Sequence, residues 1–261
     1  MNEATLSYLL AIGIKPIASV AYSYDKSVFA RLSAGEDIIP LWTSGGISLE
    51  KVLLLKPDLI LGQEWESTIY PLLSQIAPTV LYAYSDHKEC WKDQLHFIAD
   101  ILSSDETEQR FFQEYRQKTL TIKSALKQQE YQNKKISFVF SYANYWFTEG
   151  LEACLDQTLE DVGLQRLTEA LNFSAAGELA ISEEALDLID GDILFVGIDD
   201  NDNTFALESL SGVLWQNLKA VKNGQVYFVN TFDWRSPDPL AANQILDDLQ
   251  KYLVTTSHTD S

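Results

Sequence analysis

The sequence predicts an α/β fold with two similar lobes, each built on a mainly parallel sheet, joined by one long rigid helix. Three observations predict it. Short apolar runs alternate with helix-like segments, a polar middle segment keeps helical spacing, and two patterns from the first half recur in the second. With 261 residues, 46% of them hydrophobic, the chain can fill one large domain or two lobes of about 130 residues each.

The first half of the chain alternates helix and strand patterns. Apolar residues spaced three or four apart, followed by a glycine or a proline, predict helices, whereas short continuous apolar runs predict buried parallel strands. The predicted helices cover residues 3–12, 48–55, 68–76 and 91–102, and the predicted strands cover 15–21, 58–62 and 79–82. This alternation favours a parallel sheet covered by helices.

A long polar segment follows at residues 105–129. It contains no Gly or Pro, and its sparse apolar residues keep helical spacing, which predicts one solvated helix. At about 1.5 Å per residue this helix would span about 37 Å, enough for a two-lobe molecule. An ordinary surface helix of a single domain is the alternative. We expect an N-terminal lobe at 1–104, a connecting helix at 105–130 and a C-terminal lobe at 131–261.

The second half repeats features of the first. It predicts strands at 135–140, 192–196 and 225–229, and helices at 154–162 and 182–189. The frame Ile-Ser-x-Glu opens a helix at Glu50 and again at Glu184, and in both places an Asp-initiated apolar run begins eight residues later. The offset is 184 − 50 = 134 residues, about half the chain. Two lobes of similar topology are therefore expected.

Composition excludes several classes of protein. There are 38 acidic and 19 basic residues, a formal net charge of −19, which disfavours binding to nucleic acid or to an anionic membrane surface. No run approaches 18 apolar residues, and the first residues do not form a signal peptide. Cys90 and Cys154 stand in no metal-binding spacing, which favours two buried thiols and leaves a bridge between them open.

Known catalytic motifs are missing from the sequence. It contains no G-x-S-x-G, G-x-G-x-x-G, P-loop or H-E-x-x-H pattern, and only three histidines. We therefore expect no catalytic residues and no protein-bound metal site. The enzyme alternative would depend on carboxylates after the strand near Gly197, namely Asp199, Asp200 and Asp202, which are more typical of a solvated loop.

Aromatic residues follow several of the predicted strands. In open α/β sheets ligands bind beyond the carboxyl ends of the strands, so these aromatics predict a pocket for a bulky, partly apolar ligand. The candidates are Trp42, Trp65, Tyr145, Trp146 and Trp234, with Arg235 as the adjacent basic group. Trp215 has helical apolar spacing and is assigned to the core.

Glu50 and Glu184 have two possible roles. A carboxylate at a helix start complements the helix dipole by about 0.3–1 kcal/mol, and that alone explains most such residues. Their equivalent positions in the repeated frame also suit a paired acidic surface that meets two basic sockets on a partner.

At these residues the sequence resembles the siderophore and cobalamin substrate-binding proteins of bacterial ABC importers. The segment Ile47–Ile60 is similar to their N-L-E-x-[IL]-x-x-L-K-P-D-L-[IV] pattern. Further similar segments follow in the same order along the chain: Ile76–Val80, the segment around Glu184, Leu214–Val221 with Asn223–Tyr227, and the region of Trp234.

The resemblance implies a class III periplasmic-binding-protein-like fold, with the ligand in the cleft between the lobes. It also implies that Glu50 and Glu184 meet arginines of a transmembrane permease. The family normally begins with a strand before the first helix, so we expect this chain to lack that strand and its export segment. The expected location is periplasmic, as a free protein or a membrane-anchored lipoprotein, and the expected state is a monomer.

We therefore expect a non-catalytic binding protein for a ferric siderophore. Ferric-hydroxamate binders of this group usually carry an arginine shortly before the first docking glutamate, and Ser44 stands near that place. Arg235 is then the group expected to contact the iron-bound oxygens. The net charge favours a neutral or weakly charged hydroxamate or citrate-hydroxamate chelate over a trianionic catecholate. Cobalamin and haem are the alternative ligands that aromatic walls would accept.

Overall fold

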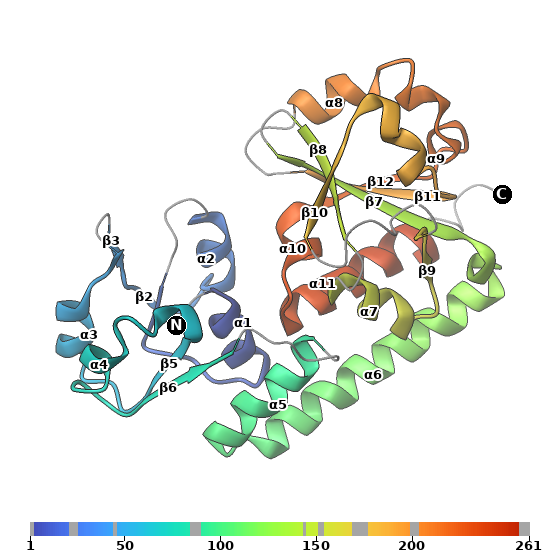
Figure 1. Ribbon diagram of the computed structural model, residues 1–261. Coiled ribbons are helices and arrows are strands. Elements are labelled where there is room, and N and C mark those ends of the chain that lie inside the picture. Colours follow the sequence, from blue (N-terminus) through green and yellow to red (C-terminus); the bar gives the residue numbers. More distant parts are fainter. Residues whose placement is uncertain are drawn as a thin grey trace. The chain divides into compact units, whose positions relative to one another are not determined.

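The computed structural model describes residues 3–20, 26–43, 46–83, 90–142, 145–150, 154–168, 177–198 and 204–255 (Figure 1). The chain divides into two compact units. Unit 1 comprises Met1–Phe112 with Asp238–Leu240, and unit 2 comprises Gln113–Pro237 with Ala241–Ser261. The division falls within helix α6 (Asp105–Gln128). This helix confirms the long helix predicted at residues 105–129.

Unit 1 contains short strands and the helices between them. The helices are α1 (Glu3–Ala11), α2 (Lys26–Leu32), α3 (Leu49–Leu55), the 3₁₀-helix η1 (Glu64–Glu66), α4 (Tyr70–Leu73) and α5 (Trp91–Leu102). The strands are β1 (Ala18–Ser19), β2 (Ile39–Pro40), β3 (Trp42–Thr43), β4 (Gly46–Ile47), β5 (Ile60–Gln63) and β6 (Thr79–Tyr82).

The strand pairs of unit 1 include the parallel pairs that the sequence predicts. β1 pairs with β2 and β5 with β6 in parallel, while β3 and β4 form a small antiparallel pair. The helix predicted at 68–76 is shorter than expected, because α4 covers only Tyr70–Leu73. A buried apolar cluster with members from β1, α3, β5 and α4 holds these elements together: Ala18, Val20, Leu41, Val52, Ile60, Leu73 and Ala77.

Unit 2 is built on a mixed sheet. Its strands are β7 (Lys135–Tyr142), β8 (Tyr145–Glu149), β9 (Gln165–Arg166), β10 (Glu178–Ile181), β11 (Ile193–Ile198) and β12 (Val226–Asn230). Its remaining elements are η2 (Tyr131–Asn133), α7 (Cys154–Asp161), η3 (Glu183–Ile189), α8 (Thr204–Leu210), η4 (Trp215–Asn217), α9 (Lys219–Lys222), α10 (Thr231–Arg235), α11 (Pro239–Leu249) and the π-helix η5 (Gln250–Thr255).

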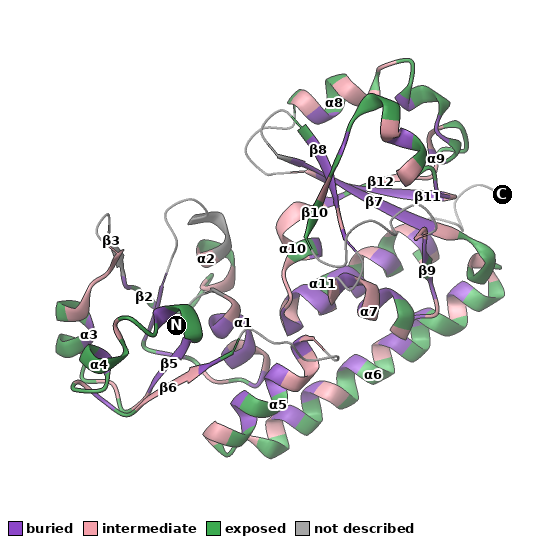
Figure 2. Cartoon of the chain, in the orientation of Figure 1, coloured by how far each residue is buried: buried purple, intermediate pink, exposed green. Residues whose placement is uncertain are grey.

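The strand order in this sheet is β10-β8-β7-β11-β12, with β9 beside the start of β7. β7, β11 and β12 run parallel, as predicted, whereas β8 runs antiparallel to both of its neighbours, β7 and β10. The sequence did not reveal β8 or β10. Figure 2 shows β7 and β11 buried along most of their lengths, as expected for central strands that are covered on both faces. The predicted α/β class is therefore confirmed.

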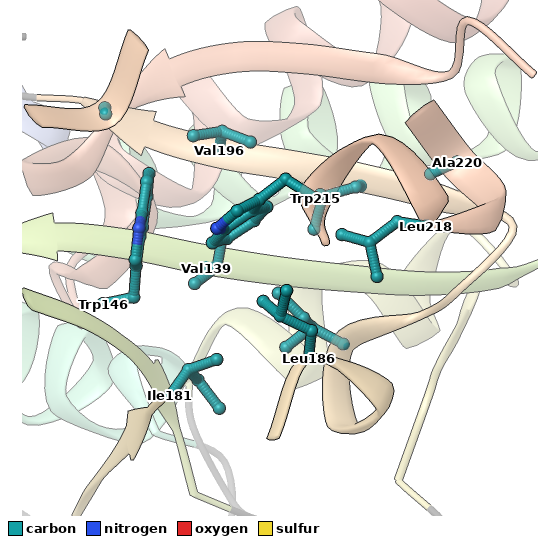
Figure 3. Close-up of a cluster of buried hydrophobic side chains, with 11 residues drawn as sticks. Val139, Trp146, Ile181, Leu186, Val196, Trp215, Leu218 and Ala220 are labelled. Carbon is teal, nitrogen blue, oxygen red and sulfur yellow. The ribbon is translucent and has the colours of Figure 1, made fainter. Parts of the chain in front are cut away.

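One hydrophobic cluster fixes the face of the sheet that carries η3, α8 and η4 (Figure 3). Trp215 is fully buried in it, which confirms its assignment to the core, and its ring centroid lies 4.8 Å from that of Trp146. Leu186 and Ile189 of η3 pack in the same cluster. The segment predicted as an ordinary helix at 182–189 is thus a 3₁₀-helix that packs its apolar side chains on the sheet.

The interpretation of Cys90 and Cys154 as two buried thiols is wrong. Each is disulfide-bonded, and neither is a free cysteine. Both residues are only half-buried.

Candidate functional site

In unit 2 the aromatic residues after β7 lie in a strand, not in a loop. Tyr145, Trp146 and Phe147 belong to β8, so their predicted loop placement is wrong. Alternation along the strand separates their side chains. Trp146 packs in the core of the η3 face, as Figure 3 shows, whereas Tyr145 and Phe147 lie on the opposite face with ring centroids 5.7 Å apart. Tyr145 is exposed and Phe147 is buried.

Arg235 lies over the Phe147 ring of this aromatic pair. It ends α10, whose start is fixed by Asn230, because the Asn230 side-chain oxygen accepts hydrogen bonds from the backbone N–H groups of Phe232 and Asp233. The Arg235 guanidinium lies 4.7 Å from the centroid of the Phe147 ring, a cation–π distance. The helix cap thus places a cation against the aromatic face of β8.

Two carboxylates bind the Arg235 guanidinium. Its Nε donates to Glu149 at 2.5 Å, and one terminal nitrogen donates to Glu178 at 2.6 Å. Glu149 and Glu178 stand directly opposite each other in the antiparallel β8–β10 pair, where two like charges repel. Arg235 relieves this repulsion, and the three groups together carry a net charge of −1.

Arg166 of β9 holds the end of β8 in place by hydrogen bonds. Its nearly inaccessible guanidinium lies 3.0 Å from Asp156 and donates to the carbonyl oxygen of Gly150 at 2.9 Å and to the hydroxyl of Thr148 at 3.3 Å. Burial lowers the pKa of Arg166, and the negative charge of Asp156 acts in the opposite direction. Arg166 therefore anchors the strand end that carries Glu149.

Trp234 is a core residue. It lies within α10, is fully buried, and has its ring centroid 4.3 Å from that of Phe195. Its indole N–H donates to Asp248 at 2.9 Å. Burial raises the pKa of Asp248, against the opposing effect of this hydrogen bond. The predicted loop placement is therefore wrong for Trp234 as well. Its side chain holds α10 against the sheet and against α11.

Unit 1 places Trp65 at the surface. Trp65 lies in η1, directly after the carboxyl end of β5, and its side chain is exposed. Glu66 fixes this turn, because its carboxylate accepts the backbone N–H of Gln63 at 2.9 Å. Trp42 lies in β3, paired with Ile47, and Ser44 lies outside the described residues.

Glu50 and Glu184 are both exposed on short helices. Glu50 is in the first turn of α3, where the Ser48 hydroxyl caps the helix by accepting the Lys51 N–H at 3.4 Å. Glu184 is in the first turn of η3 and accepts a hydrogen bond from the Ser182 hydroxyl at 3.3 Å. The repeated frame therefore leads to exposed carboxylates in both units.

Metal-binding clusters and the carboxylates of the enzyme alternative are the remaining candidates for a site. No group of three His, Cys, Asp or Glu side chains within the described ranges is arranged to hold a metal ion. Asp199, Asp200 and Asp202 lie outside those ranges. No helix in the described part of the chain is both long and apolar enough to cross a membrane.

Sequence reasoning missed the partners of Arg235 and the anchoring arginine. Glu149 is 86 positions and Glu178 is 57 positions away from Arg235 along the chain, and Arg166 stands in no recognisable motif. No local pattern could have brought these residues together.

Comparison with known proteins places this chain in a family. Residues 2–231 match the model of a family described as "Periplasmic binding protein". The chain is 29% identical to the "Probable siderophore-binding lipoprotein YfiY" of Bacillus subtilis, covering 98% of this chain and 81% of that protein. It is also 29% identical to the "Fe(3+)-citrate-binding protein YfmC" of the same bacterium, covering 88% and 72%. The solved structure of FhuD2 from Staphylococcus aureus with bound ferrioxamine B shares the fold, with a TM-score of 0.76 and 20% identity over 98% of this chain and 96% of that one. The chain belongs to the periplasmic binding protein family.

Proposed function

We propose that this protein is the substrate-binding component of an ABC importer for a ferric siderophore. The observation that carries the proposal is the match along 98% of the chain to a protein named as siderophore-binding. The Fe(3+)-citrate-binding relative supports the same class of cargo. The protein then acts by binding and delivery and catalyses no reaction.

The ligand is held by exposed groups that can meet a bulky chelate. In unit 2 these are Tyr145 and Arg235, and in unit 1 the candidate is Trp65. Trp42 and Ser44 are included in this set because of the sequence pattern alone. Trp146 and Trp234, buried within unit 2, act by holding β8 and α10 in place.

Charge around Arg235 favours a neutral or cationic ferric hydroxamate. Glu149 and Glu178 already compensate the guanidinium, so an anionic chelate meets a net charge of −1. A charge about 8 Å away contributes about 2 kcal/mol at an effective dielectric constant of about 20. A trianionic chelate is therefore penalised, whereas a neutral trihydroxamate complex keeps its aromatic contacts.

Glu50 and Glu184 serve as the contacts with the permease. Both are exposed, and neither belongs to the group formed by Arg235, Glu149 and Glu178. Exposed carboxylates suit basic sockets on a partner and steer association. Ligand binding and docking then use separate residues.

The protein works outside the cytoplasm, as a periplasmic protein or a lipid-anchored one. The relative named a lipoprotein supports this location. The absence of free cysteines, with Cys90 and Cys154 both disulfide-bonded, supports it independently, because disulfides persist in oxidising compartments.

Tryptophan fluorescence tests the proposal. The purified protein is titrated with ferrioxamine B, ferric citrate, a ferric catecholate, cobalamin and haem. We expect saturable quenching by a ferric chelate, strongest with the hydroxamate. Saturation by cobalamin or haem alone, or by none of the five, would refute the proposed cargo.

A charge-reversal variant tests the ligand class. Glu149→Gln combined with Glu178→Gln changes the cluster from −1 to +1 and should improve the affinity for an anionic chelate relative to ferrioxamine B by on the order of tenfold or more. Glu183→Gln, which removes an exposed charge on η3, is the control. An unchanged ratio of affinities would show that the cluster does not face the ligand.

A further inference from the structure

A polar hollow of about 350 Å³ lies at the edge of the unit 2 sheet where its parallel strands begin. It is formed by the turn between α6 and β7, the start of β11, and the turn between α9 and β12 (Figure 1). Its polar lining residues are Gln129, Tyr131, Lys134, Asp192, Asn223 and Gln225. Pockets that bind small molecules have volumes of about 300–1,000 Å³, so the hollow is large enough for such a ligand.

The hollow is separate from the residues that surround Arg235 in the same unit. Arg235 lies over Phe147, which pairs with Phe140 of β7. Phe140 lies about 17 Å along the strand from Lys135, where the hollow borders β7. A ligand in the hollow therefore does not use the proposed chelate contacts of unit 2.

Hydrogen bonds hold the three wall segments of the hollow together. The Asp192 N–H donates to the carbonyl oxygen of Lys135 at 2.8 Å, and the Lys135 N–H donates to the Asp192 carboxylate at 2.8 Å. The Leu194 N–H donates to the carbonyl oxygen of Gln225 at 2.9 Å. Gly191 lets the first two segments approach, because a Cβ there would lie 2.8 Å from the carbonyl oxygen of Lys135. The shape of the hollow is therefore set by the sheet itself.

The one carboxylate that lines the hollow already has partners from the chain. One oxygen of Asp192 accepts the Lys135 N–H, and the other lies 2.5 Å from the Lys219 ammonium. Burial would raise the pKa of Asp192, but these two contacts and the charge of Lys134 outweigh it, so the pKa is lowered. Asp192 therefore stays ionised, and each of its oxygens already holds a donor.

The polar groups that remain for a ligand are mainly donors. The Gln225 side-chain oxygen accepts the Tyr227 hydroxyl at 3.0 Å, which leaves its NH₂ group to donate. Tyr227 is held in turn by stacking on Tyr252, with the ring centroids 5.1 Å apart. Burial raises the pKa of Tyr131, so its hydroxyl keeps its proton. The Tyr131 hydroxyl, the Lys134 ammonium and the Gln225 NH₂ group thus line the hollow as donors.

The charge of the wall segments is opposite in sign to that of the chain. Residues 129–135, 190–193 and 219–225 carry four lysines and three carboxylates, a net charge of +1, in a chain with a net charge of −19. The Lys219 ammonium compensates Asp192, whereas the exposed Lys134 ammonium can reach a ligand. A cation among neutral donors favours an oxyanion over a neutral molecule, because hydrogen bonds between charged groups are the stronger ones.

We propose that this hollow binds a small oxyanion that also carries hydroxyl groups, a hydroxycarboxylate or a sugar phosphate. The Lys134 ammonium and the Tyr131 hydroxyl bind the anionic group, and the carboxamides of Asn223 and Gln225 bind the hydroxyl groups. The site lies within unit 2 and goes beyond the proposed function, since it does not depend on the ferric cargo.

NMR titration of the isotope-labelled full chain with gluconate, glucose phosphate and glucose tests the proposal. We expect saturable shifts of the backbone amides of Tyr131, Asp192 and Asn223 with gluconate or glucose phosphate, and none with glucose. The anion that binds more tightly shows whether the natural ligand is a carboxylate or a phosphate. Equal binding of glucose, or no saturation by either anion, would overturn the inference.

Substitutions with opposite expected effects test the role of charge. Lys134→Gln should weaken the binding of the tighter anion about fivefold, as expected for an exposed ion pair, and Asp192→Asn should strengthen it by a similar factor. Arg116→Gln is the matched control, because Arg116 is exposed on α6 about three turns before the end of that helix. Equal affinities in the Lys134 and Arg116 variants would overturn the inference. Asn223→Ala, at an exposed residue, should also weaken binding, and an unchanged affinity in that variant would overturn it too.

Ferrioxamine B separates this site from the proposed chelate contacts. Its affinity, measured by tryptophan fluorescence, should be the same with and without a saturating concentration of the anion. Competition between the two, or anion-induced shifts at Tyr145 and Arg235, would assign the anion to the chelate-binding residues and overturn the inference. Anion binding in the hollow by a protein that binds no ferric chelate would refute the proposed function and support this inference.

Discussion

The pair of Arg166 and Asp156 supplies a test of how the site is supported. The Arg166 side chain is only 4% exposed, and its terminal nitrogen lies 3.3 Å and 3.0 Å from the two carboxylate oxygens of Asp156. Asp156→Asn keeps the size of the side chain and removes its charge, so that a buried cation loses its counter-ion. Removing one partner of a buried ion pair costs about 3–5 kcal/mol.

The magnitude follows from the exposure of the two groups. Asp156 is 19% exposed, so water partly reaches the pair and the lower end, about 3 kcal/mol, applies. At about 2–4 °C per kcal/mol for a chain of this size, the melting temperature should fall by about 6–12 °C. Urea unfolding followed by circular dichroism measures the free-energy difference directly, provided that the m value is unchanged.

The control is the exposed pair of Lys118 and Asp247 in the same unit. Its nitrogen–oxygen distance is 2.8 Å, but Asp247 is 57% exposed. Asp247→Asn should therefore cost less than about 1 kcal/mol. Equal losses in the two variants would refute the reasoning, because burial would then have no influence on the strength of the pair.

Three further outcomes are expected. Gly197→Ala should destabilise the protein by about 1–3 kcal/mol in urea unfolding, because its new Cβ would lie 2.2 Å from the buried ring of Phe140; a loss below 0.5 kcal/mol would contradict this packing. Burial raises the pKa of Asp248 in the folded protein. The contribution of Asp248 to the free energy of unfolding is therefore fully present below the unfolded pKa of about 3.9, and it is lost as the pH rises through the folded pKa. Asp248→Asn should consequently gain stability relative to wild type between pH 3 and pH 6, measured by urea unfolding at each pH; a constant difference would count against the shift. Thiol titration of the unfolded protein should detect no thiol before reduction and both Cys90 and Cys154 after it, whereas two thiols before reduction would remove the disulfide.

The elements that sequence reasoning predicted are those with continuous patterns. β7, β11 and β12 are apolar runs long enough to be read as buried strands, and α6 has helical periodicity over 24 residues. β1 to β4 have two residues each, which is too short for any periodicity. β8 was missed because its aromatic residues come shortly after a predicted strand, where a loop was expected.

The site divides in the same way. The positions of Glu50 and Glu184 in the first turn of a helix were predictable because each lies in a local four-residue frame, and their role in docking stays a prediction. Arg235 was predictable as a lone basic residue beside aromatics, but its carboxylate partners come from β8 and β10 and meet it only through tertiary packing. The compensation of its charge, on which the proposed preference among chelates depends, required the structure.

Native mass spectrometry of the protein after incubation with a mixture of ferric siderophores, cobalamin and haem tests the central claim most directly. We expect one added mass per chain, equal to that of a ferric hydroxamate complex. A chain that acquires only cobalamin or haem, or that stays unloaded in a mixture containing every siderophore class, would contradict the account.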